Sequence, residues 1–213
     1  MSEQSNDGSL QRYVRKHELR LARRLSLWRD AQLARHALRD AGEPGLVLDV
    51  PSGAGRFWPV LAEHANRIIL AADPSTTMLE FAEARSSSDL LQRIRTFQSS
   101  AFSIGLSANA VDCIFCMRLF HHLADREQRL SILQEFYRVT RDTAIVALWV
   151  DGNLKAWRRK RQQAGKPAVS GRFVVCRSDI EAEFAQAGFS IVDHHDFLPG
   201  YAMWRVYTLR KQG

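Results

Sequence analysis

One carboxylate in this chain stands between a short apolar run and a turn built of small residues. Asp49 follows the run Leu46–Leu48, and Pro51, Gly53 and Gly55 lie in the turn. Small residues let the backbone approach a ligand closely, and a helix after such a turn offers unpaired N–H donors at its N-terminus. A carboxylate at the strand end suits a cationic or amine-bearing ligand better than a pyrophosphate. These residues therefore favour S-adenosylmethionine, which carries an ammonium and a sulfonium, over NAD.

A second carboxylate, Asp73, ends the next apolar run, Ile68–Ala72, and is followed by Pro74. It stands 24 residues after Asp49, close to the ~20 residues that separate a glycine-rich turn from a ribose-binding acid. A carboxylate there can accept hydrogen bonds from both ribose hydroxyls. The alternative is that Asp73 only caps the helix that begins near Ser75. The agreement of strand, spacing and first turn favours the ribose.

The two stretches resemble the first two motifs of the Rossmann-like (class I) S-adenosylmethionine-dependent methyltransferases. The first motif of that family is acidic-x-Gly-x-Gly-x-Gly, and Pro51 takes the first glycine position here. The resemblance implies that Asp49 and the turn hold the methionine end of the cofactor, and that Asp73 holds the ribose. A NAD-dependent oxidoreductase is the rival, and it is disfavoured because Trp58 occupies the third glycine position of Gly-x-Gly-x-x-Gly.

The resemblance also implies cofactor contacts after the third and fourth strands. Ser100 stands where many relatives have an aspartate that accepts the adenine amino group, so that charge is missing here. Met117 and Arg118 correspond to the loop beside the methyl-transfer site. The full set of cofactor-binding residues expected on this resemblance is Asp49, Pro51, Gly53, Gly55, Asp73, Pro74, Ser100, Ala101, Phe102, Met117 and Arg118.

Two adjacent histidines, His121 and His122, follow this loop and are the candidate catalytic bases. Histidine titrates in the useful range, but a base is needed only if the acceptor is a hydroxyl or a similarly poor nucleophile. The alternative is that either histidine starts a helix and packs. His194 and His195 are adjacent on a predicted strand and so point to opposite faces, which indicates structural roles.

The net charge of +7 is unevenly distributed along the chain. Residues 11–41 hold nine Lys or Arg and three acids, in a pattern that predicts an amphipathic helix. Residues 152–178 hold eight Lys or Arg and no acid. Two segments therefore carry all of the excess positive charge.

The second basic segment follows the predicted fifth strand, Ala144–Val150. In the resembled family this segment lies over the substrate opening, so Trp157, Arg158 and Arg159 are the candidate acceptor-binding residues. A basic loop there would attract a phosphate, a carboxylate, RNA or an anionic lipid headgroup. The alternative is a solvated loop that binds no ligand.

The order of apolar runs and turns predicts an α/β fold, a doubly wound and mostly parallel seven-stranded sheet whose last strand is antiparallel. Residues 1–43 are predicted to form a basic helical extension or lid, ended by Gly42 and Pro44, and residues 44–213 the methyltransferase domain. The closing pair of strands, Phe189–Phe197 and Ala202–Leu209, matches the end of the resembled family.

The three cysteines predict no metal site. Cys113 and Cys116 have C-x-x-C spacing but lie on a predicted strand, where residues three apart point to opposite faces. We expect them and Cys176 to be buried, reduced thiols. The N-terminus is polar and lacks an apolar signal core, and no apolar stretch reaches the ~20 residues of a membrane span. The sequence thus favours a cytoplasmic protein.

The function predicted from these residues is transfer of a methyl group from S-adenosylmethionine to an anionic small-molecule or lipid-linked acceptor. O-methylation is favoured, because no Asn-Pro-Pro-Tyr-like motif of base N-methylation follows the fourth strand. Two alternatives stay open. One is an RNA methyltransferase, and the other is a catalytically silent module of the same fold that binds RNA or, peripherally, an anionic membrane.

Overall fold

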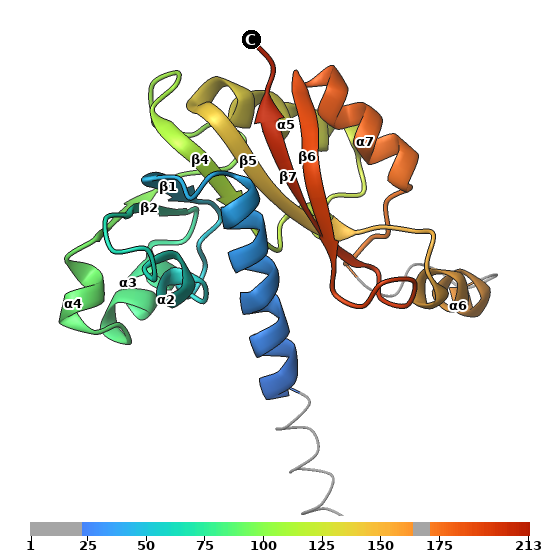
Figure 1. Ribbon diagram of the computed structural model, residues 1–213, viewed down its shortest axis with the longest axis horizontal. Coiled ribbons are helices and arrows are strands. Elements are labelled where there is room, and N and C mark those ends of the chain that lie inside the picture. Colours follow the sequence, from blue (N-terminus) through green and yellow to red (C-terminus); the bar gives the residue numbers. More distant parts are fainter. Residues whose placement is uncertain (1–22, 164–170) are drawn as a thin grey trace, which may run out of the picture. The chain divides into compact units, whose positions relative to one another are not determined.

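The computed structural model describes residues 23–163 and 171–213. Residues 33–213 form one compact unit, built on a single sheet (Figure 1). A helix over residues 23–40 precedes the first strand, and the earlier part of the predicted amphipathic helix lies outside the described residues. No helix of the described ranges is long and apolar enough to cross a membrane.

The sheet has the strand order β3-β2-β1-β4-β5-β7-β6. Its strands are β1 (Leu46–Asp49), β2 (Ile68–Asp73), β3 (Ile94–Gln98), β4 (Val111–Cys116), β5 (Thr140–Trp149), β6 (Phe189–Asp196) and β7 (Trp204–Lys211). The helices that follow the first strand are α2 (Trp58–Leu61), α3 (Thr76–Ala84), α4 (Ser88–Leu91), the 3₁₀ turn η1 (Phe120–His122), α5 (Arg126–Val139), α6 (Leu154–Gln163) and α7 (Arg177–Gln186).

Strands β1 to β5 pair in parallel, and β7 lies antiparallel between β5 and β6. The predicted seven-stranded, mostly parallel fold with an antiparallel last strand is therefore confirmed. The carboxyl ends of the parallel strands meet at one edge of the sheet, and the strand order reverses between β1 and β4. In open α/β sheets, ligands bind outside this edge, at the point of reversal.

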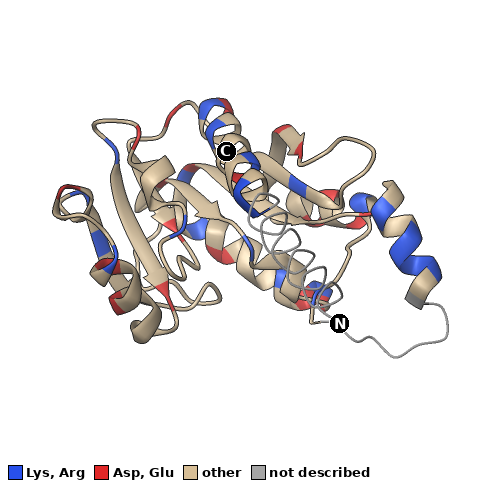
Figure 2. Cartoon of the chain, turned by 90° about the horizontal axis from the view of Figure 1, so that it is seen from below, with Lys and Arg blue, Asp and Glu red and all other residues tan. Residues whose placement is uncertain are grey.

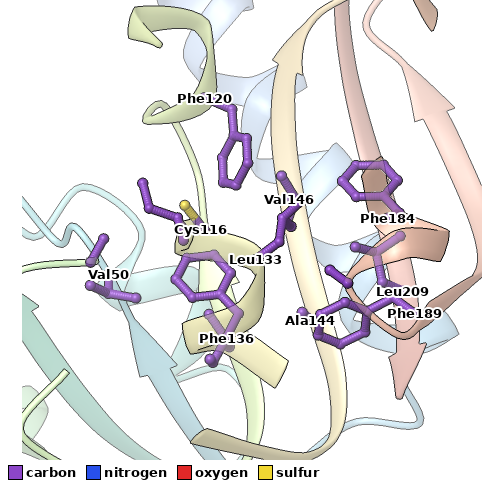
Figure 3. Close-up of a cluster of buried hydrophobic side chains, with 14 of the residues drawn as sticks. Val50, Cys116, Phe120, Leu133, Phe136, Ala144, Val146, Phe184, Phe189 and Leu209 are labelled. Carbon is purple, nitrogen blue, oxygen red and sulfur yellow. The ribbon is translucent and has the colours of Figure 1, made fainter. Parts of the chain in front are cut away.

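One face of the sheet is covered by α5 and α7. Phe136 of α5 and Phe184 of α7 are fully buried and belong to one apolar cluster with the strand residues Val146 and Leu209 (Figure 3). On the opposite face, the hydroxyl of Thr208 on β7 donates to the carbonyl of Ala37 in the preceding helix, and Phe57, just before α2, packs edge to face on Phe115 of β4.

Two local predictions were wrong. The helix expected after the glycine-rich turn, from the apolar segment Arg56–Ala65, is only the short α2. The buried Arg67 side chain donates to the carbonyl of Leu61 at 3.0 Å, and Arg93 donates to that of Ala62 at 2.8 Å. Those two carbonyls would otherwise accept the next helical N–H groups.

The basic segment expected as a loop after the fifth strand begins as a helix, α6. Asn153 caps it, since its Oδ1 accepts the N–H of Ala156 at 2.9 Å. The residues of α6, Leu154–Gln163, are mostly straight-chain helix formers and include no glycine or proline. The positive charge of this segment is therefore displayed along a helix (Figure 2).

Candidate functional site

Hydrogen bonds join the glycine-rich turn after β1 to the end of β2. The N–H of Gly53 donates to Oδ2 of Asp73 at 2.8 Å, and the N–H of Ser52 donates to the carbonyl of Ala72 at 2.8 Å. The indole Nε1 of Trp58 donates to the Ser52 hydroxyl at 2.8 Å. The turn that follows Asp49 and the strand end that carries Asp73 are thus hydrogen-bonded to each other.

Backbone conformation explains the glycines of this turn. Gly53 and Gly55 have φ values of +55° and +68°, which favour glycine. A Cβ at Gly55 would also lie 2.8 Å from the Trp58 ring. Pro51, in the first glycine position of the motif, opens the turn and is half-buried behind a cis Val50–Pro51 peptide bond.

Asp49 lies at the end of β1 and is only 2% exposed. Burial, helped by the charge of Asp73, raises the pKa of this carboxyl to about 7, against hydrogen bonds from Ser52 and Trp58 that lower it. Near neutral pH this carboxyl is therefore partly protonated, and a nearby cation would favour its ionised form.

One oxygen of this carboxyl provides a test of whether an amine-bearing cofactor fits. Oδ2 of Asp49 is buried and has no hydrogen-bond partner among the described residues. Buried polar atoms in native proteins are nearly always paired. The ammonium of S-adenosylmethionine would supply the missing donor, directly or through a water molecule, so the residues present fit this group.

Asp73 is also buried, and both of its oxygens already accept backbone N–H groups. Oδ2 binds Gly53, and Oδ1 accepts from the N–H of Ser75 at 2.9 Å. The helix α3 is capped by the hydroxyl of Ser75 itself, which accepts from Met78, so Asp73 is not its N-cap. Each carboxylate oxygen offers two lone pairs, and a ribose would use the second ones. Pro74 follows and is exposed.

The residues expected near the adenine lie in a tight turn after β3. The Ser100 hydroxyl accepts the N–H of Phe102 at 3.2 Å, Ala101 is buried, and the Phe102 ring is 44% exposed. The turn is joined to the ribose side of the site, because the N–H of Ser99 donates to the carbonyl of Asp73 at 3.1 Å. The exposed Phe102 ring is thus available to pack against a base.

The two residues of the loop after β4 that were predicted to contact the cofactor differ in their exposure. Met117 is buried, whereas Arg118 is exposed and has a φ of +76°, which is uncommon for a residue other than glycine. Such backbone conformations cluster at functional sites. The Arg118 guanidinium lies 6.0 Å from the centre of the Trp204 ring.

Comparison with known proteins agrees with this geometry. Residues 47–143 match the family described as "Methyltransferase domain". A methyltransferase-like protein of Schizosaccharomyces pombe, itself uncharacterised, is 28% identical over 107 residues. That match covers 50% of this chain and 38% of the relative, so the chain spans well under two thirds of the relative's length. Residues 47–143, which contain both carboxylate motifs, are thus similar to a methyltransferase domain.

Two solved structures show the same fold. Magnesium protoporphyrin IX methyltransferase of Synechocystis PCC 6803, with bound S-adenosylhomocysteine, has a TM-score of 0.70 at 18% identity, over 88% of this chain and 83% of that one. An S-adenosylmethionine-dependent methyltransferase of Thermotoga maritima has a TM-score of 0.65 at 16% identity, over 94% and 97%. The fold of this chain is thus shared with methyltransferases, one of which was solved with S-adenosylhomocysteine bound.

His121 lies within the matched residues 47–143 and beside Trp149 at the end of β5. It is 1% exposed, and its ring stacks on Trp149 with 5.6 Å between centroids. Burial lowers its pKa to about 3, helped by His122 and the positive charges of Arg118 and Arg172. The imidazole is therefore neutral at physiological pH, and a second proton on the ring is unfavourable.

His122 is exposed, and its Nδ1 lies 2.9 Å from the carbonyl of Gly171. A carbonyl can only accept, so the proton sits on Nδ1 and the lone pair is on Nε2. The two histidines belong to the three-residue turn η1, and their ring centroids lie 4.1 Å apart. A role as general base stays a prediction for both.

A cavity of about 990 Å³ lies between α6 and the segment after Gly171. Two of the three predicted acceptor-binding residues, Trp157 and Arg159, line it, whereas Arg158 does not belong to its described lining. Lys160, Arg172 and Phe173 are further lining residues that the sequence analysis did not single out. One lining residue is joined to the segment after β4, since the N–H of Phe173 donates to the carbonyl of His121 at 2.7 Å.

The remaining residues singled out from the sequence are the three cysteines and His195. Cys113 and Cys116 are buried thiols, and burial raises the pKa of Cys113 to about 12, whereas Cys176 is exposed, contrary to prediction. His195 has a structural contact, since its Nε2 lies 2.6 Å from Oδ2 of Asp40.

Proposed function

We propose that this chain transfers a methyl group from S-adenosylmethionine to an oxygen of an anionic small molecule. The observation that carries the proposal is the cavity between α6 and residues 171–176, lined by the cations Arg159, Lys160 and Arg172. It opens beside the end of β5, the next parallel strand from β4 on the sheet edge where the cofactor motifs lie. A lipid-linked anion shares this chemistry with a free one.

The charges around the cavity favour an acid as acceptor. Asp151 is the only carboxylate in the described lining, and its Oδ1 accepts the N–H of Arg177 at 2.9 Å. Three cations against one acid attract an anion from solution and hold it. A volume near 990 Å³ is at the upper end of the range for small-molecule sites. The acceptor is thus a small molecule of negative charge rather than a long polymer.

In this proposal, the cofactor is held by Asp49, the turn with Gly53 and Gly55, and Asp73. S-adenosylmethionine, when bound, supplies an electrophilic methyl carbon and leaves as S-adenosylhomocysteine. The residues of the chain would align the acceptor oxygen with that carbon and exclude water. The Ser100–Phe102 turn would close over the adenine, and Met117 and Arg118 would lie at the reactive end.

The low pKa of His121 favours an acceptor oxygen that is already ionised. A base with a pKa near 3 takes a proton from a hydroxyl only at a large cost. An acceptor oxygen that arrives ionised needs no base, because its lone pair forms the C–O bond while the C–S electron pair moves to sulfur. An oxyanion bound by Arg159 and Arg172 meets this condition, with His122 as the base if the acceptor is a hydroxyl.

The test is a transfer assay with methyl-labelled S-adenosylmethionine and matched acids, alcohols and short RNA. We expect label in the acids, and a raised acceptor KM with unchanged cofactor affinity in Arg159→Gln. Arg158→Gln is the matched control, since Arg158 neighbours it on α6 outside the described cavity lining. Label only in RNA would favour the RNA methyltransferase, and cofactor-independent RNA or membrane binding without transfer would favour the silent module.

A further inference from the structure

The first turn of α6 is hydrogen-bonded to the connection between β6 and β7 (Figure 1). The N–H of Leu154 donates to the carbonyl of Gly200 at 3.0 Å, and the N–H of Lys155 donates to that of Tyr201 at 3.0 Å. The connection is itself a tight turn, since the carbonyl of Leu198 accepts the N–H of Tyr201 at 3.1 Å. The two segments therefore form one surface, although they lie far apart in the sequence.

Four large apolar or aromatic side chains on this surface are exposed to solvent. Their exposed fractions lie between 38% and 53%, and they belong to Leu154, Trp157, Leu198 and Tyr201. These four residues, called here the apolar patch, come from both segments. A single exposed apolar side chain is ordinary, whereas a group of them on one surface marks an interaction site. The apolar patch therefore indicates a partner that removes it from water.

The exposed face of α6 combines apolar side chains with guanidinium groups. Arg158 follows Leu154 by four residues and is exposed. Arg161 follows Trp157 by four residues, is also exposed, and lies 4.2 Å from the centre of that ring. Residues three or four apart share one face of a helix. Ala156 lies on the other side of α6 and is buried, so the face with the two arginines points away from the protein.

The cations beside the apolar patch have no carboxylate partner. A third cation, Lys155, lies over the Tyr201 ring at 5.1 Å. Among the described residues, Lys155, Arg158 and Arg161 form no ion pair. Residues 152–178 contain no acid that could supply one. The apolar patch is thus bordered by positive charge that an anionic partner would neutralise.

We propose that the apolar patch, with Lys155, Arg158 and Arg161 beside it, docks on the surface of an anionic lipid bilayer. Peripheral proteins bind such surfaces with apolar side chains that enter the headgroup boundary and with cations that attract the anionic lipids. Tryptophan and tyrosine favour this boundary, because each ring has an apolar body and a polar group. The docking goes beyond the proposed function, since these three cations lie outside the described cavity lining.

Docking at this surface would bring the cavity next to the bilayer. Leu154 and Trp157 belong both to the apolar patch and to the described lining of the cavity. An anionic acceptor that is anchored in the bilayer by an apolar chain would then reach the cavity from the membrane surface. This consequence rests on the proposed function, whereas the docking itself does not.

Single-stranded RNA is the other anionic partner that a basic helix could bind. Proteins that bind such strands stack successive bases on aromatic rings along a cationic groove. Half of the apolar patch, Leu154 and Leu198, is aliphatic and offers no ring for a base. Burial of aliphatic side chains contributes directly to binding at the headgroup boundary. The structure therefore favours the bilayer, and binding of RNA is an outcome of the test.

The experiment is co-sedimentation of the full chain with lipid vesicles, without any cofactor. One set of vesicles contains phosphatidylcholine alone, and the other contains an equimolar mixture of phosphatidylcholine and phosphatidylglycerol. We expect the chain to bind the anionic vesicles and not the neutral ones. Binding should weaken as the salt concentration rises, because salt screens the attraction between the cations and the lipids.

Single substitutions separate the contribution of charge from that of apolar contact. Arg158→Gln and Arg161→Gln should each lower the partition coefficient about fivefold, the contribution of one cation near an anionic surface. Leu198→Ser should lower it by a similar factor, because roughly half of that side chain remains to be buried. All three residues are exposed and lie outside the described cavity lining, so the fold and the cavity stay unchanged.

The matched control variants lie outside this surface. Arg210→Gln removes an exposed cation near the other end of β7, where it pairs with Asp142 at 3.4 Å. Phe81→Ser removes an exposed ring on α3. We expect both variants to bind the anionic vesicles as tightly as the parent.

The proposal is overturned if the chain does not bind the anionic vesicles, or if the two arginine variants bind them like the controls. The latter result would assign the binding to the basic residues 11–41. An unchanged affinity of Leu198→Ser, with displacement of the chain from vesicles by oligouridylate, would indicate RNA and also overturn it. Transfer of label to a soluble acid tests the proposed function separately, so either proposal can fail without the other.

Discussion

The backbone N–H of Gly53 donates to Oδ2 of Asp73 at 2.8 Å, which links the glycine-rich turn after β1 to the end of β2. The same carboxylate holds the N–H of Ser75 through its other oxygen. One side chain therefore orders both the turn expected to hold the methionine end of the cofactor and the start of the segment beside the ribose. Cofactor affinity and local order depend on the same group.

Replacement of Asp73 tests this double role. Asp73→Asn keeps the size of the side chain but loses the charge and one acceptor oxygen. We expect S-adenosylhomocysteine affinity to fall about 10- to 100-fold, because a hydrogen bond to a charged group contributes roughly 1.5–3 kcal/mol. Calorimetry measures the loss, and Glu80→Gln on the exposed side of α3 is the control. Equal affinity in Asp73→Asn and the parent would show that the ribose is bound elsewhere.

The raised pKa of Asp49 predicts a pH dependence of cofactor binding. An ammonium prefers the ionised carboxylate, so affinity should fall by up to about tenfold per pH unit below about 7. Asp49→Asn should flatten the profile between pH 5 and about 7. Binding measured in buffers of different ionisation enthalpy should also show a proton released near neutral pH. A flat profile in the parent would contradict the ammonium contact.

The same group affects the stability of the cofactor-free protein. Its folded pKa, about 7, lies above the ordinary value of 3.8, so the folded chain holds the proton more tightly than the unfolded chain. The stabilisation from that proton is present below the ordinary pKa and is lost as the pH rises through the folded one. Denaturant titrations of the parent and Asp49→Asn should therefore diverge between pH 4 and 7, with only the parent losing this contribution.

Gly55 should not tolerate a side chain. A Cβ would lie 2.8 Å from the Trp58 ring, at a backbone φ of +68° that other residues rarely adopt. We expect Gly55→Ala to lower the free energy of unfolding by about 1–3 kcal/mol. Gly105→Ala, where a Cβ meets nothing within 4 Å, is the matched control. Equal unfolding curves for the two variants would mean that the turn is looser than described.

A buried ion pair holds α5 against α7. Arg129 donates through Nε and Nη2 to both carboxylate oxygens of Glu183 at 2.9 and 2.6 Å, and both side chains are nearly inaccessible. Glu183→Ala would leave the guanidinium buried without its anion, at a cost of about 3–5 kcal/mol. Thermal unfolding measures this loss. The exposed Glu127→Ala on α5 is expected to change little, and a Glu183→Ala melting curve equal to it would count against the pair.

Sequence alone predicted the parts of the fold that depend on short-range patterns. Asp49 and Asp73 each end an apolar run, and the strand ends follow from that. The shortened α2 was not predictable in the same way, because the side chains that take its carbonyls, Arg67 and Arg93, come from later in the chain. Asn153 at the start of α6 was a local signal that could have identified that helix.

In the candidate site, too, the residues with local signals were predicted and those that depend on long-range contacts were not. The turn residues Gly53 and Gly55 were found because their spacing is local. The contacts of His121 with Trp149 and Trp204 were missed, because the antiparallel pairing of β7 with β5 brings these tryptophans together. Nothing near His121 in the sequence indicates that its ring is buried and its pKa lowered. Long-range contacts decide such properties, and residue types do not.

The central claim is that this chain binds the cofactor of the methyltransferase family. Calorimetric titration of the purified protein with S-adenosylhomocysteine, with NAD as the control ligand, tests it most directly. The account predicts a Kd in the micromolar range for S-adenosylhomocysteine and no heat of binding for NAD. Absence of binding to S-adenosylhomocysteine, or binding to NAD alone, would contradict it.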